Sequence, residues 1–268
     1  MYFAAGRTSE LDGGIHLYGL DAATGKQLHH TLLEGPDYAT DAEGKLVVSR
    51  ASAAMRPGEQ FPENYDLPMG ALPDVLMGDG ELIYMRTMTF DAGLKRTRGK
   101  AALSAKGGFL DDSYFKRAPW TFGGRDYARL IVHDERNVCS VRMFDSLEGL
   151  DPSVYFTPGA KGYLLFAKGP DGKRELWSQR LGVRVRAMVL AGGRLVAAGP
   201  PDVLHAKDPL GAFEGRKGGV LCVFDSASGR KLAEQPLASP PVFHGAAAAR
   251  GRLFLTAEDG SVSCFGKR

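Results

Sequence analysis

Cysteine is scarce in this chain. The 268 residues include three cysteines, Cys139, Cys222 and Cys264, which lie far apart and form neither a CxxC pair nor a CxxCH haem-attachment motif. An odd number of cysteines cannot close a disulfide framework, and widely separated thiols do not have the spacing of a structural zinc site. We expect all three to be small, buried, apolar residues.

Long apolar runs are also missing. No stretch approaches the roughly 18 apolar residues of a transmembrane helix. Residues Met1 to Gly6 lack the charged start and the apolar segment of a signal peptide. We therefore expect no membrane span and no signal peptide in this chain.

Neither sign of charge predominates. The chain has 34 basic and 31 acidic residues, a formal net charge of +3, and the charges are spread along its length. This is too weak and too even for a surface that binds phosphate backbones, so nucleic acid is not an expected partner.

Glycine and proline, by contrast, are abundant, and they are distributed rather than pooled in one linker. The 35 glycines and 15 prolines favour many tight turns between short strands over a few long helices. The composition therefore indicates an all-β chain.

The strongest signal is an internal repeat. Residues Leu17–Leu28 match Leu221–Leu232, with aspartate, threonine or serine, glycine, a basic residue and leucine in the same register. Each copy predicts a strand, a turn and a second strand, because aspartate caps such a turn and glycine supplies a positive φ. A weaker third copy spans Leu164–Trp177.

A second recurring unit is a small turn followed by a charged residue, leucine and a β-rich run. It starts at Gly44, Gly80, Ala128, Gly193 and Gly251. The spacing fits four-stranded antiparallel blades of about 40 to 50 residues with loop insertions, the pattern of a β-propeller. The end of the chain predicts one full blade over residues 183–236 and three strands of the next over 242–265.

The Asp-x-x-Thr/Ser-Gly-Lys/Arg-x-Leu turn resembles the pyrroloquinoline-quinone-like (PQQ-like) repeat of quinoprotein dehydrogenases and of propeller lipoproteins of outer-membrane assembly. Segments 107–115 and 212–219 are similar to those of large repeat proteins of planctomycete-type bacteria. The resemblance implies a single PQQ-like propeller domain over residues 1–268, with about five recognisable blades. It further implies a partial or C-terminal portion of a propeller of about seven or eight blades, in a periplasmic or extracellular protein.

The chain departs from the quinoprotein pattern at its chemistry. It has no adjacent cysteine pair, and the tryptophan that usually follows the turn is replaced by His29 and Ala233 in the two clear copies, leaving Trp177 in the third. We therefore predict no cofactor; PQQ and calcium belong to the alternative considered below.

Two groups of residues are candidate sites. Asp202, His205 and Asp208 have side chains of the kind that bind cations and lie in a loop between the second and third strands of a blade, so they predict a metal site. Paired carboxylates, an arginine and an aromatic ring predict a small polar ligand or carbohydrate site. Its residues are Asp111, Asp112, Arg117 and Trp120.

No nucleophile motif accompanies these groups, and His133 and His244 stand alone. The leading hypothesis is a non-catalytic propeller scaffold that binds a protein or a small polar ligand, as part of a larger exported protein. The alternative is a quinoprotein-type oxidoreductase, PQQ-dependent, with its site partly outside this chain. Fold alone does not decide between them.

Overall fold

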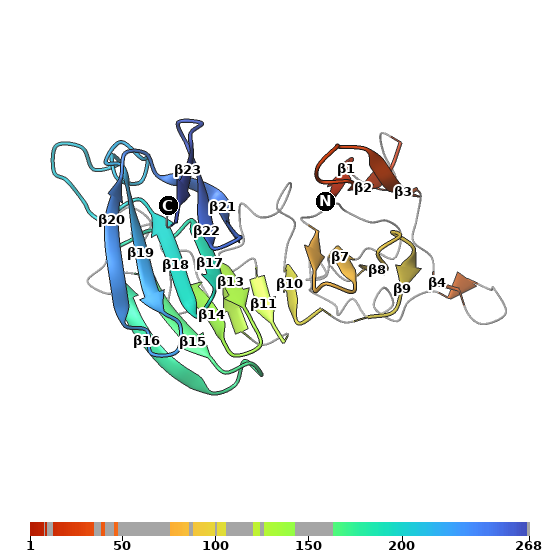
Figure 1. The fold of residues 1–268 in the computed structure, drawn as a ribbon, viewed down its shortest axis with the longest axis horizontal. Helices are drawn as coiled ribbons and strands as arrows, with labels where there is room; N and C mark the ends of the chain where they lie inside the picture. Colours follow the sequence, from red (N-terminus) through yellow and green to blue (C-terminus); the bar gives the residue numbers. More distant parts are fainter. Residues whose placement is uncertain are drawn as a thin grey trace, which may run out of the picture. The chain divides into compact units, whose positions relative to one another are not determined.

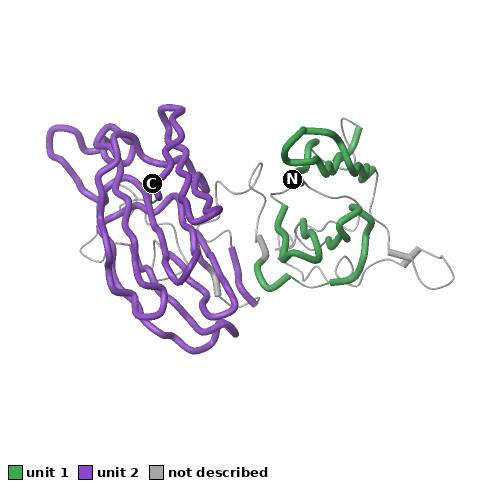
Figure 2. The backbone as a smooth tube through the Cα atoms, in the orientation of Figure 1, with its two compact units in different colours: residues 1–119 green, residues 120–268 purple. Residues whose placement is uncertain are grey.

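A computed structural model describes residues 1–7, 9, 13–34, 39–40, 46–47, 76–85, 88–99, 101–105, 120–123, 126–142 and 163–266. All regular secondary structure in these residues is β-strand (Figure 1). The chain forms two compact units, residues 1–119 and residues 120–268 (Figure 2). The prediction of one domain over the whole chain stays a prediction.

Unit 1 contains a three-stranded and a four-stranded antiparallel sheet. The first is formed by β1 (Tyr2–Ala5), β2 (Ile15–Leu20) and β3 (Gln27–Leu33). The second is formed by β6 (Met77–Gly78), β7 (Ile83–Met85), β8 (Met88–Phe90) and β9 (Arg96–Thr97). The remaining strands of this unit are the pair β4 (Ala39–Thr40) and β5 (Leu46–Val47), and β10 (Leu103–Ala105).

Unit 2 contains two four-stranded sheets followed by a three-stranded one. A short pair, β11 (Trp120–Phe122) and β12 (Asp126–Ala128), precedes them. The first sheet is β13 (Leu130–His133), β14 (Val138–Arg142), β15 (Tyr163–Lys168) and β16 (Glu175–Leu181). The second is β17 (Ala187–Ala191), β18 (Arg194–Gly199), β19 (Gly219–Asp225) and β20 (Lys231–Leu237). The third is β21 (Pro241–Ala249), β22 (Arg252–Ala257) and β23 (Val262–Phe265).

Every described sheet runs antiparallel with its strands in chain order, and the first strands of the last three sheets of unit 2 are neighbours. Strand β13 lies beside β17, and β17 lies beside β21 (Figure 1). First strands that line up in this way, with each sheet extending outward from them, are the arrangement of propeller blades. The predicted fold class, all-β with four-stranded antiparallel blades, is confirmed.

The strand predictions for the end of the chain are also confirmed, with one change at the start. The first strand of the complete blade begins at Ala187, because Val183 makes only an isolated bridge to Pro201. A second difference concerns the recurring glycine-charge-leucine unit. Its copy at Leu130 begins β13, the first strand of a sheet, whereas its copies at Gly193 and Gly251 come just before β18 and β22, the second strands of their sheets. The unit therefore predicts a strand correctly, but that strand does not always hold the same position within its sheet.

The two clear repeats fold into hairpins of the same register. Strand β2 pairs with β3, and β19 with β20, with a bulge at the equivalent step, Gly19/Leu20 and Val223/Phe224. In the second copy the Oδ1 of Asp225 accepts hydrogen bonds from the Ser228 amide at 2.9 Å and from its hydroxyl at 2.7 Å. These bonds lower the pKa of Asp225, as Thr24 lowers that of Asp21. The predicted turn chemistry is therefore present in both copies.

The third repeat shows what the turn contacts. Strands β15 and β16 pair with the same bulge, and Trp177 occupies the position of Ala233 in β20. Its Nε1 donates to the Ser226 carbonyl at 2.9 Å, and the Gln179 amide donates to the Gly229 carbonyl at 2.8 Å. The fourth strand of one sheet thus holds the third-to-fourth turn of the next.

Unit 1 repeats this contact with different residues. The hydroxyl of Thr31, on β3, donates to the Leu94 carbonyl at 2.8 Å, in the turn between β8 and β9. Asp91 caps that turn by accepting from the Gly93 and Lys95 amides. Leu94 has a φ of 62°, close to the 72° of Gly229. Asp91 therefore begins a further repeat that the sequence pattern missed.

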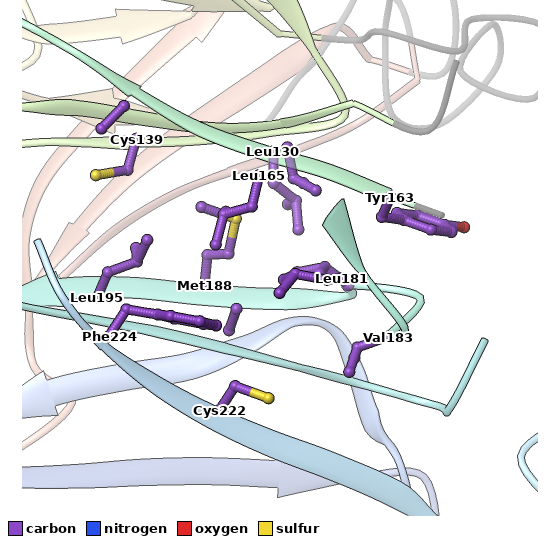
Figure 3. Packing of buried hydrophobic residues seen from close by; sticks show 14 residues of the cluster. Leu130, Cys139, Tyr163, Leu165, Leu181, Val183, Met188, Leu195, Cys222 and Phe224 are labelled. Atoms are coloured by element: carbon purple, nitrogen blue, oxygen red, sulfur yellow. The ribbon is translucent and has the colours of Figure 1, made fainter. Parts of the chain in front are cut away.

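An apolar core fills the space between the two four-stranded sheets of unit 2. Leu165 is fully buried on one sheet, and Leu195 and Phe224 are fully buried on the other. Figure 3 shows these side chains facing one another across the interface. This packing fixes the first strands on which the candidate site below is built.

Gly229 offers a test of the contact between sheets. A Cβ there would lie 2.6 Å from the Trp177 ring, whereas Gly193, with nearly the same φ of 71°, opens onto empty space. We expect Gly193→Ala to cost about 1 kcal/mol from backbone strain, and Gly229→Ala to cost about 1–3 kcal/mol more because the ring must move. Urea unfolding measures both, and equal losses would contradict the tight packing of Trp177 on this turn.

Candidate ligand site on the first strands of unit 2

His244 lies on an irregular step of β21. Between the pairs Pro241–Ala257 and Ala246–Leu255 the register shifts, so the strand carries extra residues there. His244 itself has a φ of 59°, and a Cβ on the neighbouring Gly245 would lie 2.8 Å from the Thr256 carbonyl oxygen. Non-glycine residues at positive φ and strand bulges are concentrated at functional sites.

The bulge is held from both sides. The His244 amide donates to the Arg186 carbonyl at 2.9 Å, next to β17. The Trp120 indole Nε1, on β11, lies 3.4 Å from His244 Nε2, and the two rings meet edge to face with centroids 5.8 Å apart. An indole N–H can only donate, so Nε2 must accept and a neutral ring carries its proton on Nδ1.

The surroundings of His244 favour this neutral form. Desolvation of the ring, reinforced by the positive charge of Arg129, lowers the pKa of His244 to about 4. The residue as a whole remains solvent-exposed. Near neutral pH the imidazole is an uncharged donor and acceptor.

Arg129 supplies the positive charge of the site. Its guanidinium carbon lies 5.2 Å from the centroid of the Phe243 ring, which itself meets the His244 ring at 4.3 Å. The Nε of Arg129 is buried and has no hydrogen-bond partner in the described structure. A buried donor without a partner is costly unless something supplies an acceptor.

Arg186 extends the polar surface from the neighbouring sheet. Its guanidinium donates to the Phe213 carbonyl at 2.7 Å and pairs with the carboxylate of Glu258. Because Glu258 neutralises Arg186, the positive charge that lacks an acidic partner among the described residues belongs to Arg129.

The predicted metal residues lie where expected, between β18 and β19, but each carboxylate contacts a basic residue. Asp202 lies 3.1 Å from Arg184 Nε, with both side chains 6% exposed. Asp208 binds Arg216 at 2.5 Å, and its amide donates to the His205 carbonyl. Among the residues described here, no three histidine, cysteine, aspartate or glutamate side chains are placed to share a metal ion. The metal site stays a prediction.

Of the predicted ligand residues, Asp111, Asp112 and Arg117 lie outside the described residues. Trp120 is buried, at 5% exposure, and contacts His244. Sequence analysis missed the role of Arg129 and treated His244 as isolated. The available signal was the Pro-Pro and Phe-His-Gly sequence at the start of β21, which is unusual inside a strand.

No protein-family model matches the chain, and no curated protein matches it. The computationally designed Ika4 protein aligns over 71% of this chain and 88% of its own, with 10% identity and a TM-score of 0.34. BamB from Moraxella catarrhalis aligns over 95% of this chain, with 14% identity and a TM-score of 0.27; the chain spans 65% of that BamB chain. TM-scores this low do not establish a shared fold, so the propeller assignment depends on the sheets themselves.

The described residues include no helix with the length and apolar character needed to cross a membrane.

The lowered pKa of His244 predicts a pH-dependent stability. The unfolded imidazole takes up a proton near pH 6.5, whereas the folded one resists it until about pH 4. Its contribution is therefore complete above pH 6.5 and is lost as the pH falls toward 4. We expect the unfolding free energy of the natural chain to fall below pH 6.5 relative to His244→Asn, which tolerates the positive φ. Parallel pH profiles for the two proteins would contradict this.

Asp202 gives a second stability prediction. Asp202→Asn removes the carboxylate that lies 3.1 Å from the buried Arg184 Nε, and we expect a loss of about 3–5 kcal/mol. The control is Asp208→Asn, which breaks a pair whose arginine side chain is 53% exposed, so that solvent screens it and the expected loss is much smaller. Urea unfolding at neutral pH compares them. A similar small loss in both variants would show that Asp202 is better solvated than its burial implies.

Proposed function

We propose that this chain is a non-catalytic propeller scaffold that binds a carboxylate group at the His244 site. The carboxylate can belong to a segment of a protein or to a small polar molecule. Neighbouring sheets of unit 2 contribute to this site: β11 provides Trp120, Arg129 precedes β13, Arg186 precedes β17, and β21 provides His244.

The observation that carries the proposal is the state of Arg129. A planar guanidinium suits a carboxylate because its parallel N–H groups can bind both oxygens. Here it lies over an aromatic ring, next to a neutral imidazole, with its buried Nε lacking an acceptor in the described residues. A bound carboxylate would supply that acceptor and balance the charge.

The remaining expectations follow the sequence resemblance alone. Export of the protein, its periplasmic or extracellular location and the size of the complete propeller stay predictions. The oxidoreductase alternative has no observation in its favour among the residues described, where Cys139 and Cys222 are buried separately and Cys264 is exposed.

The test titrates the chain with acetyl-trialanyl-glutamate, and with its uncharged glutamine-amide counterpart, by calorimetry and tryptophan emission. Trp120 is one of two tryptophans in the chain, so its emission reports on the site. We expect saturable binding of the glutamate peptide only, weakened at least about tenfold by Arg129→Met through the lost charge-assisted hydrogen bonds.

The matched control is Arg174→Met, because Arg174 is exposed in the turn between β15 and β16, at the other end of that sheet from Arg129. Its binding curve should match that of the natural chain. Equal binding of the two peptides, or an equal loss in both arginine variants, would refute the carboxylate site.

A further inference from the structure

The connection between β18 and β19 is a folded segment without strands of its own. It covers residues 200–218 and is referred to below as the β18–β19 loop. Within it, the amides of Gly211 and Glu214 donate to the carbonyls of Asp208 and Leu210. The loop therefore has an internal hydrogen-bonded structure.

Two arginines that precede β17 hold this loop from one side. The carboxylate of Asp202 lies 3.1 Å from Arg184 Nε, and the guanidinium carbon of Arg184 lies 5.6 Å from the Phe213 ring centroid. The guanidinium of Arg186 donates to the Phe213 carbonyl at 2.7 Å. The loop is thus fixed at both its beginning and its middle.

The last sheet holds the loop from the other side. Gly215 has a φ of 82°, and a Cβ there would lie 2.7 Å from the Glu258 carboxylate and 2.9 Å from the Pro240 ring. This close approach requires glycine. Since Glu258 also pairs with Arg186, the contacts of the loop with the two sheets meet at one ion pair.

Although it is held in this way, the loop exposes large apolar side chains. Val203 and Leu204 are each 49% exposed, Leu210 is 39% exposed and Phe213 is 36% exposed. Apolar side chains gathered on one exposed segment are typical of surfaces that bind another molecule. A loop that is already folded loses little conformational entropy when it binds.

Arg186 connects this apolar surface to the His244 site. Its carbonyl accepts from the His244 amide at 2.9 Å, and its guanidinium donates to the Phe213 carbonyl. One residue therefore contacts both the strand bulge and the loop. A ligand bound by its carboxylate at the His244 site needs to extend only past Arg186 to reach the loop.

The charges of the loop leave its apolar side chains as the distinguishing feature. Asp202 lies beside Arg184, and Asp208 and Glu214 both bind Arg216. Because these acidic groups already have basic neighbours, the loop does not select a ligand by a strong charge of its own. The combined surface suits one carboxylate next to apolar groups.

We propose that the β18–β19 loop is the second part of the His244 site, and that the ligand is an extended segment of a partner protein in which large apolar residues flank an acidic one. The carboxylate binds Arg129, and the apolar residues contact Leu204, Leu210 and Phe213. This inference rests on the function proposed above. It selects the protein segment over the small polar molecule, which would leave the loop uncovered.

The test compares two heptapeptides, acetylated and amidated, with a glutamate at the centre. The leucine peptide has two leucines at each end, and the alanine peptide has alanine at those four positions. Leucines on both sides make the result independent of the direction in which the chain binds. By calorimetry we expect the leucine peptide to bind at least about tenfold more tightly, because its leucines are removed from water.

The double variant Leu204→Ser with Leu210→Ser should remove this gain and leave binding of the alanine peptide unchanged. The matched control is Leu232→Ser. Leu232 is 39% exposed, as Leu210 is, but it lies beside the β19–β20 turn, at the other end of the sheet from the loop. The control should keep the gain, and unfolding curves establish that the variants are folded.

The outcomes separate this inference from the proposed function. Equal binding of the two peptides, or an equal loss of the gain in Leu232→Ser, would overturn the role of the loop while leaving the carboxylate site in place. Binding of neither peptide would refute the carboxylate site, and the inference with it. Binding of the leucine peptide that is unaffected by Arg129→Met would contradict a single continuous site.

A second copy of the chain is the competing occupant of the loop. A dimer in sedimentation that dissociates in the double leucine variant, together with equal binding of the two peptides, would assign the apolar surface to self-association and overturn the inference.

Discussion

The described structure depends most on one contact, in which the last strand of one sheet holds a turn of another sheet. Trp177 and Gln179 bind the turn of the second four-stranded sheet of unit 2, and Thr31 binds the corresponding turn in unit 1. The turn can be held only if its main chain keeps one shape. The aspartate cap and the positive φ provide that shape before any packing occurs.

This dependence explains why the fold was predictable. The capped turn is a local structure, so its residues appear together in the sequence, and the strands on either side follow from it. The repeat at Asp91 was missed because its turn is one residue shorter and uses Leu94, not glycine, at the positive φ. The pattern searched for glycine, whereas the structure requires only a backbone carbonyl in the correct place for Thr31.

The site was much less predictable, because its residues meet through tertiary structure. Trp120 was identified as a ligand residue, but its partner His244 is placed by a register shift in β21 that no local pattern specifies. Asp202 has a typical cation-binding side chain, yet in the structure its carboxylate lies 3.1 Å from the Nε of the buried Arg184. The sequence shows which groups a side chain is able to bind, but the tertiary structure determines which group it contacts.

The outer hairpin and the first strand of a sheet therefore have different structural roles. The outer hairpins of the two clear copies repeat the same register, and such hairpins hold sheets together, so the capped turn recurs in them. The first strands carry no such turn and are supported from outside by the core around Phe224. Irregular backbone at His244 and a buried arginine nitrogen can be tolerated there. Binding chemistry is expected where the repeat breaks, because only there is the sequence free of the contact between sheets.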